Sequence, residues 1–267
     1  MKFINLIGRI NSIATAIISR LLKNWQGKVQ YSEEKGGDLH LLFEVEQPFN
    51  ALYEKGMQLS GTPERGNKRR SRFYNLVNLL RTVNHLEGSI VECGCWKGLS
   101  SYLMCHFLKE MNSNFDGDAY YIIDSFEGLS APSSEDVINY SLIDHVGERK
   151  GSHFKEAGAY SAQMADVKKV LSEFPQINYL QGWIPQCLND LPNKKFKFVH
   201  IDVDLYEPIL GALNYFYPKL VTGGMIVCDD YGSLYWPGAQ KAVEEFAEKN
   251  NLSFISLSSG QAVFIKQ

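Results

Sequence analysis

Residues 196–208, FKFVHIDVDLYEP, give the strongest indication of the fold. The stretch begins with a mostly apolar run that is typical of a buried strand, and it continues into Asp202 and Asp204. It then reaches Pro208, a residue favoured in the first turn of a helix. A buried strand that leads directly into a helix predicts a βα unit of a parallel sheet. The acids at the strand end also predict a site, because buried carboxylates need a positively charged partner.

The same pattern recurs on both sides of this stretch. Apolar runs alternate with helical patterns, and a hairpin of two short strands follows around Gly260. We therefore predict an α/β, Rossmann-like fold whose mostly parallel sheet contains one antiparallel strand. The further strands are expected at 89–94, 119–124, 177–180 and 223–230, with helices at 100–111, 162–174 and 237–250 and the hairpin at 252–257 and 262–266.

Composition sets the broad class of the protein. The chain has 267 residues, 45% of them hydrophobic and 21% charged, and a net charge of -3, so we expect a globular protein that does not bind nucleic acid. Five cysteines without a regular framework indicate reduced thiols and a cytoplasmic location. Residues 1–75 are expected to form a helical extension, and residues 76–267 the main domain, with a lid insertion at about 125–165.

The first residues have apolar side chains at helical spacing, interrupted by Arg9 and Arg20, which argues against a membrane span. A docking or oligomer helix is favoured, and weak contact with a membrane surface is the alternative. The basic cluster at 68–72 is expected to form a solvated face, although contact with an anionic substrate would be a more specific role.

Two motifs suggest a nucleoside cofactor. In VECGCWKGLS, residues 91–100, Gly94 and Gly98 permit a close turn, and Glu92 suits a positively charged ligand such as S-adenosylmethionine. Asp124 ends the next strand, where an acid can bind ribose hydroxyls. An ordinary glycine-rich turn and a helix N-cap are the simpler alternatives. Trp183, after the third strand, is a candidate for packing near the adenine.

Asp202, Asp229 and Asp230 follow two strands that we expect to be neighbours, so their carboxylates should converge. Mutual repulsion would raise the pKa of some of them, and a divalent cation, most simply Mg²⁺, would remove that conflict. Capped, solvated strand ends are the alternative. His200 faces the same side and is interpreted mainly as a core histidine.

The motifs VECGCWKGLS, IIDSFEGL, YLQGWIPQCL, FVHIDVDLYEPILGALNYFYPKL and GGMIVCDDYGSLYWPGAQKAVEEF together resemble the macrocin O-methyltransferase family, over about residues 75–267. The resemblance implies a class I methyltransferase fold and a homodimer. It implies that Glu92 and Gly94 lie against the methionine part of the cofactor and that Asp124, with Ser125 beside it, holds the ribose. It also implies metal binding by Asp202, Asp229 and Asp230, and a general base at Asp204.

The expected function is therefore metal-dependent methylation, from S-adenosylmethionine, of a hydroxyl on a sugar or similar diol in natural-product or glycan biosynthesis. The acceptor would be a small molecule or glycan with vicinal hydroxyls. A glycosyltransferase or phosphatase that uses the D-x-D acids for a metal is an alternative, as is a non-catalytic cofactor-binding protein.

Overall fold

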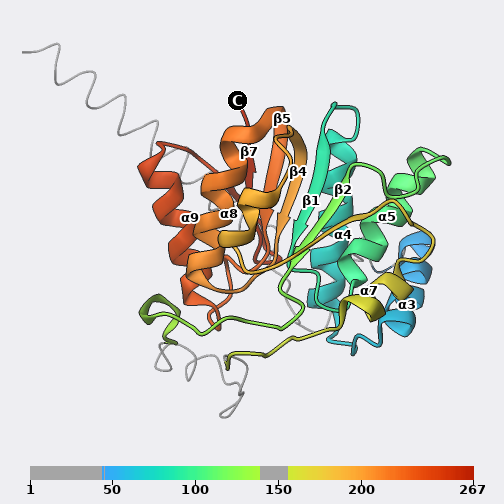
Figure 1. Ribbon diagram of the computed structural model, residues 1–267, viewed down its shortest axis with the longest axis horizontal. Coiled ribbons are helices and arrows are strands. Elements are labelled where there is room, and N and C mark those ends of the chain that lie inside the picture. The colour runs from blue at the N-terminus through green and yellow to red at the C-terminus, as the bar shows by residue number, and fades with distance from the viewer. Residues whose placement is uncertain (1–43, 45, 139–155) are drawn as a thin grey trace, which may run out of the picture. The chain divides into compact units, whose positions relative to one another are not determined.

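One seven-stranded sheet forms the centre of the computed structural model, which describes residues 44, 46–138 and 156–267 (Figure 1). The strand order is β3-β2-β1-β4-β5-β7-β6. Strands β1 to β5 are parallel, whereas β7 runs antiparallel to both β5 and β6. The strands are β1 (Ser89–Cys93), β2 (Tyr120–Asp124), β3 (Asn178–Gln181), β4 (Phe196–Ile201), β5 (Leu220–Cys228), β6 (Ile255–Ser256) and β7 (Ala262–Ile265).

The chain adds β2 and β3 on one side of β1 and then crosses to add β4 and β5 on the other side. The order therefore reverses between β1 and β4. In open α/β sheets the crevice outside the carboxyl ends of the strands at such a switch point is the usual ligand site. The predicted Rossmann-like sheet, with its antiparallel addition, is confirmed.

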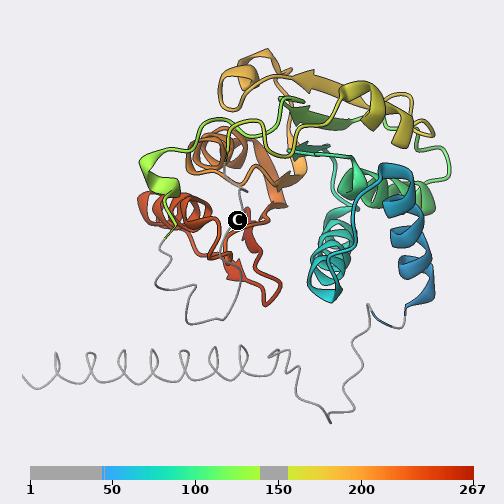
Figure 2. The same cartoon turned by 90° about the horizontal axis from the view of Figure 1, so that it is seen from below.

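Helices cover both faces of this sheet, as Figures 1 and 2 show. The shorter connections are the 3₁₀ turns η1 (Ser134–Asp136), η2 (Gln186–Asp190) and η3 (Tyr217–Lys219). One face packs against α8 (Tyr206–Phe216) and α9 (Pro237–Lys249). The other face packs against α3 (Gln47–Ser60), α4 (Asn67–Val83), α5 (Leu99–Met111) and α7 (Met164–Val170).

Strand alternation explains why there are two cores. Ile90 and Phe198 contribute to the core under α4 and α5, whereas Val91 and Val199 contribute to the core under α8 and α9. His200 is two residues after Phe198 and belongs to the α4–α5 face by the same alternation. Asp202, two residues further on and directly after β4, therefore lies on the side of the sheet that α4 covers.

Several boundaries differ from those predicted. Helix α8 begins at Tyr206, before Pro208, because a carboxylate oxygen of Asp136 accepts a hydrogen bond from the Tyr206 backbone N–H at 2.9 Å. Helix α7 is shorter than the predicted helix at 162–174. Helix α4 runs across position 75, and the division into an N-terminal extension and a main domain stays a prediction.

The predicted N-terminal amphipathic helix and part of the predicted lid, residues 139–155, lie outside the described residues. Among the helices that are described, none is both long and apolar enough to cross a membrane.

Candidate active site

The tips of the central strands lie in register at one edge of the sheet. Gly94, Asp202 and Asp229 are the first residues after β1, β4 and β5. The backbone N–H of each donates to a carbonyl near the end of a neighbouring strand, at 2.8, 2.8 and 2.9 Å. These bonds extend the pairing of the sheet by one residue and bring the side chains that follow the strands to one place.

The close approach of the turn after β1 to the backbone of Asp202 requires glycine at position 94. Its φ is +81°, and a Cβ atom built on it would lie only 2.0 Å from the carbonyl oxygen of Asp202. A side chain at position 94 would therefore meet backbone, which cannot move aside as a flexible side chain can. The turn between β1 and α5 can pass β4 closely only because the residue is glycine.

A cavity of about 1190 Å³, partly open to solvent, lies over these strand tips. Every sequence-predicted site residue except Glu92 lines it. Its other walls come from α4 and the preceding loop, through Arg65, Arg69 and Arg72, and from the described part of the predicted lid, through Leu129 and Tyr160.

An aspartate group occupies the floor of the cavity. Oxygen atoms of Asp202, Asp204 and Asp230 lie within 4.8 Å of one another, and a second group joins His200, Asp202 and Asp229. Burial, and then repulsion by neighbouring carboxylates, raises the pKa of Asp202 and of Asp204 well above the usual range. Asp230 Oδ2 is buried without a hydrogen-bond partner. An oxygen-rich group with an unsatisfied oxygen fits a hard divalent cation.

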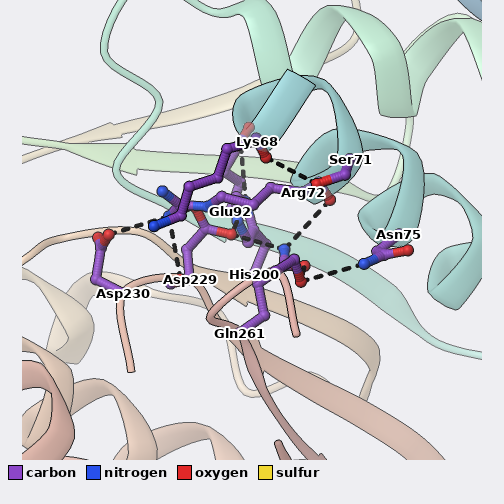
Figure 3. A network of polar contacts seen from close by, with 10 residues as sticks. Lys68, Ser71, Arg72, Asn75, Glu92, His200, Asp229, Asp230 and Gln261 are labelled. Carbon is purple, nitrogen blue, oxygen red and sulfur yellow. Dashed lines mark hydrogen bonds and ion pairs between the residues drawn. The ribbon is translucent and has the colours of Figure 1, made fainter. Parts of the chain in front are cut away.

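Arg72 is the positively charged partner of Asp229 and Asp230 (Figure 3). Its guanidinium is paired with a carboxylate oxygen of Asp229 and lies 3.0 Å from Asp230 Oδ1. Burial opposes ionisation of both groups, but their attraction prevails: the pKa of Arg72 is raised and that of Asp229 is lowered. The expectation of a solvated basic face is therefore wrong for Arg72, because α4 packs directly over the strand tips.

Glu92 has interior partners instead of cavity contacts. Its fully buried carboxylate accepts hydrogen bonds from Ser101 and, at 3.1 Å, from Tyr120. Nδ1 of His200 lies 3.0 Å away from Glu92 Oε1. Contact between Glu92 and the methionine part of a cofactor stays a prediction, whereas the structure assigns this carboxylate to a polar network beneath the cavity.

His200 is fully buried and links that network to Asp229, whose Oδ1 lies 3.6 Å from His200 Nε2. That distance allows an ion pair but is too long for a hydrogen bond. Burial lowers the pKa of His200, but contacts with Asp229 and Glu92 outweigh burial and raise that pKa to about 10. A buried, partnered histidine agrees with the core interpretation of this residue.

Asp124 organises the glycine turn and also lines the cavity. Its Oδ2 accepts from the backbone N–H of Cys95 at 2.8 Å and of Trp96 at 3.2 Å, and its Oδ1 accepts from Phe126 at 2.8 Å. Each carboxylate oxygen can accept more than one hydrogen bond, so these contacts leave capacity for ribose hydroxyls. Ribose binding by Asp124 stays a prediction.

Ser125 and Trp183 complete the predicted cofactor residues at the cavity. The Ser125 hydroxyl donates to the carbonyl of Gly128 at 2.8 Å, which fixes the start of the loop after β2. Trp183 is 38% exposed and lines the cavity near the end of β3. A flat, accessible ring suits stacking on a base, and packing of Trp183 near the adenine stays a prediction.

Sequence reasoning missed several residues at this site. Arg65 lies in the loop before α4, and no local pattern identifies it. Arg69 and Arg72 are three residues apart on α4, a helical spacing that places them on one face and could have revealed their common orientation. Gln261, by contrast, lies just before β7 and donates to Asp229 Oδ1 at 2.7 Å. No local sequence pattern identifies it.

The fold and the site define the class of protein: a Rossmann-like, class I methyltransferase fold. The solved structure of the O-methyltransferase NovP superposes with a TM-score of 0.60 at 18% identity, covering 84% of this chain and 98% of that chain. Residues 63–258 match the model of the macrocin O-methyltransferase (TylF) family, so the chain belongs to that family.

Two curated relatives come from Streptomyces. The chain is 26% identical over 200 residues to an 8-demethyl-8-(2,3-dimethoxy-α-L-rhamnosyl)-tetracenomycin-C 4'-O-methyltransferase of Streptomyces olivaceus, with 72% of each chain covered. It is 25% identical over 174 residues to demethyldecarbamoylnovobiocin O-methyltransferase of Streptomyces niveus, covering 64% of this chain and 62% of that relative. The second match thus spans less than two thirds of the relative's length.

Proposed function

We propose that this protein transfers the methyl group of S-adenosylmethionine to a hydroxyl of a sugar or similar diol, with the help of a divalent cation. The observation that carries the proposal is the meeting of the glycine turn at Gly94, the ribose candidate Asp124 and the aspartate group in one cavity. Membership of the macrocin O-methyltransferase family and the names of the two relatives, one of which acts on a rhamnosyl group, support it.

The cation would be held by Asp202, Asp229 and Asp230. When bound, a divalent cation lowers the pKa of an alcohol in contact with it, which makes a neutral hydroxyl a usable nucleophile. Arg72 pairs with Asp229 and Asp230 and keeps both carboxylates in place from the side of α4. The unpartnered Asp230 Oδ2 is the oxygen that most needs a positive ligand.

Asp204 is proposed as the general base. The acceptor hydroxyl would give its proton to this carboxylate while its oxygen attacks the methyl carbon, and the carbon–sulfur bond would break with its electron pair left on sulfur. The raised pKa of Asp204 brings its basicity closer to that of a useful proton acceptor near neutral pH. Asp204 also has a φ of +60°, an unusual conformation for a residue other than glycine that is often found at functional sites.

Methyl transfer from labelled S-adenosylmethionine to a panel of sugar-bearing acceptors with vicinal hydroxyls tests the proposal. Protein stripped with EDTA should lose activity, and Mg²⁺ should restore it. Full activity of fully stripped protein would contradict the role of the metal. Asp204→Asn should lower turnover by about a hundredfold or more while leaving affinity for S-adenosylhomocysteine unchanged. Normal turnover of this variant would assign the base to another group.

Family membership favours methyl transfer over the D-x-D glycosyltransferase and phosphatase alternatives, and binding of S-adenosylhomocysteine without turnover would indicate the non-catalytic alternative. A homodimer, a cytoplasmic location and contact of the N-terminal segment with a membrane surface stay predictions.

A further inference from the structure

Two arginines on one wall of the cavity have no role in the chemistry described so far. Arg65 and Arg69 line the same cavity as the aspartate group. The Arg65 guanidinium lies 6.0 Å from the centre of the Tyr160 ring, and that of Arg69 lies 5.8 Å from the Trp96 ring. Arg69 also donates to the carbonyl of Pro63 at 2.7 Å. These contacts hold both cations at the cavity wall before any ligand arrives.

Several nearby carboxylates already pair with other arginines, whereas Asp202, in the aspartate group, attracts Arg69 electrostatically. Glu54 and Glu64 lie within ion-pairing distance of Arg70, and Asp229 and Asp230 pair with Arg72. Within residues 44, 46–138 and 156–267, no carboxylate forms an ion pair with Arg69. Burial, followed by repulsion from Arg65, lowers the pKa of Arg69, as expected for cations that crowd one wall.

The charge of the methyl donor does not explain why Arg65 and Arg69 line the cavity. S-adenosylmethionine carries a sulfonium and an ammonium group against a single carboxylate, so its own net charge is positive. Further cations that line the same cavity would oppose its binding unless an anion lies between them. The acceptor is the other ligand of the cavity, and it can supply that anion.

Building on the proposed function, we propose that the acceptor is an anionic sugar bearing a phosphate or diphosphate group, and that Arg65 and Arg69 bind this group. One guanidinium suffices for bidentate binding of a carboxylate, whereas two on the same wall can share the more numerous oxygens of a phosphate or diphosphate. The anion would lie at the arginine wall while the hydroxyl to be methylated reaches the aspartate group.

Calorimetric titration of full-length protein loaded with S-adenosylhomocysteine and Mg²⁺ tests the inference without requiring turnover. The probes are uridine diphosphate glucose, glucose 1-phosphate, glucuronic acid and methyl glucoside, which separate diphosphate, phosphate, carboxylate and neutral sugar. The phosphorylated probes should bind at least about tenfold more tightly than methyl glucoside, because hydrogen bonds between guanidinium and phosphate are charge-assisted. Arg69→Gln and, separately, Arg65→Gln should each remove most of this advantage.

Arg81→Gln is the matched control, because Arg81 lies on the same helix and also stacks on an aromatic ring, that of Phe107, but does not line the cavity. It should leave the preference for phosphorylated probes unchanged. Equal affinity for phosphorylated and neutral probes, or equal affinity for glucuronic acid and glucose 1-phosphate, would overturn the inference. So would weaker binding of S-adenosylhomocysteine to Arg69→Gln, which would assign the arginine to the carboxylate of the cofactor. Failure of the protein to bind S-adenosylhomocysteine at all would instead refute the proposed function.

Discussion

At the scale of the residue, Gly94 connects backbone conformation to the geometry of the site. Replacing it with alanine puts a Cβ atom against the Asp202 carbonyl oxygen and imposes a left-handed φ on a residue with a side chain. We expect Gly94→Ala to lower the free energy of unfolding by at least about 2 kcal/mol, from the conformational penalty and the displacement of β4 together. Urea unfolding followed by tryptophan fluorescence measures this loss.

Gly61 provides a control in the left-handed conformation. Its φ is +61° and its ψ is +27°, and the only described atom near a Cβ built on it is Lys97 Nζ, the end of a flexible side chain, at 4.0 Å. Gly61→Ala should therefore show the conformational penalty alone, about 1–2 kcal/mol. Equal losses in the two variants would mean that the close approach of the turn to β4 contributes nothing, and the argument for Gly94 would fail.

At the scale of the element, α4 is joined to the turn before β7 by a buried chain of hydrogen bonds (Figure 3). Gln261 donates to Asp229 at 2.7 Å and to the Arg72 carbonyl at 3.3 Å, and its own oxygen accepts from Ser259 at 2.8 Å. Gln261→Ala should cost about 1.5–3 kcal/mol of unfolding free energy, because a buried carboxylate loses a donor. Chemical denaturation of the purified variant measures this cost.

A control for Gln261 is Gln240, whose side chain donates to Glu244 at 2.9 Å on the exposed face of α9. Gln240→Ala should change stability by less than about 0.5 kcal/mol. Gln261→Glu should be more harmful than Gln261→Ala, since it directs a second carboxylate at Asp229. A stability of Gln261→Glu equal to that of the unaltered chain would rule out the hydrogen bond to Asp229 as a structural contact.

These elements also show what sequence can predict. Apolar strands and their terminal acids are local patterns, so the sheet, the glycine turn and the convergence of Asp202 with Asp229 follow from the sequence. The packing of α4 over the strand tips is a tertiary relationship, and it alone gives Arg72 its carboxylate partners. The interior partners of Glu92 are also tertiary: Ser101 and Tyr120 come from other elements and donate to its carboxylate, and no local pattern around Glu92 identifies them.

At the scale of the whole molecule, a cation bound by strands far apart in sequence should be linked to folding. The unfolded chain does not hold Asp202 and Asp230 together, so a cation selects the folded state. At about 100 times its dissociation constant, Mg²⁺ should add about 2.7 kcal/mol and raise Tm by about 5 to 10 °C in EDTA-stripped protein. Asp230→Asn should abolish most of this shift because it removes a charged ligand. Differential scanning calorimetry with NaCl at matched ionic strength separates binding from screening, and an equal shift with NaCl, or in Asp230→Asn, would refute a cation site at these aspartates.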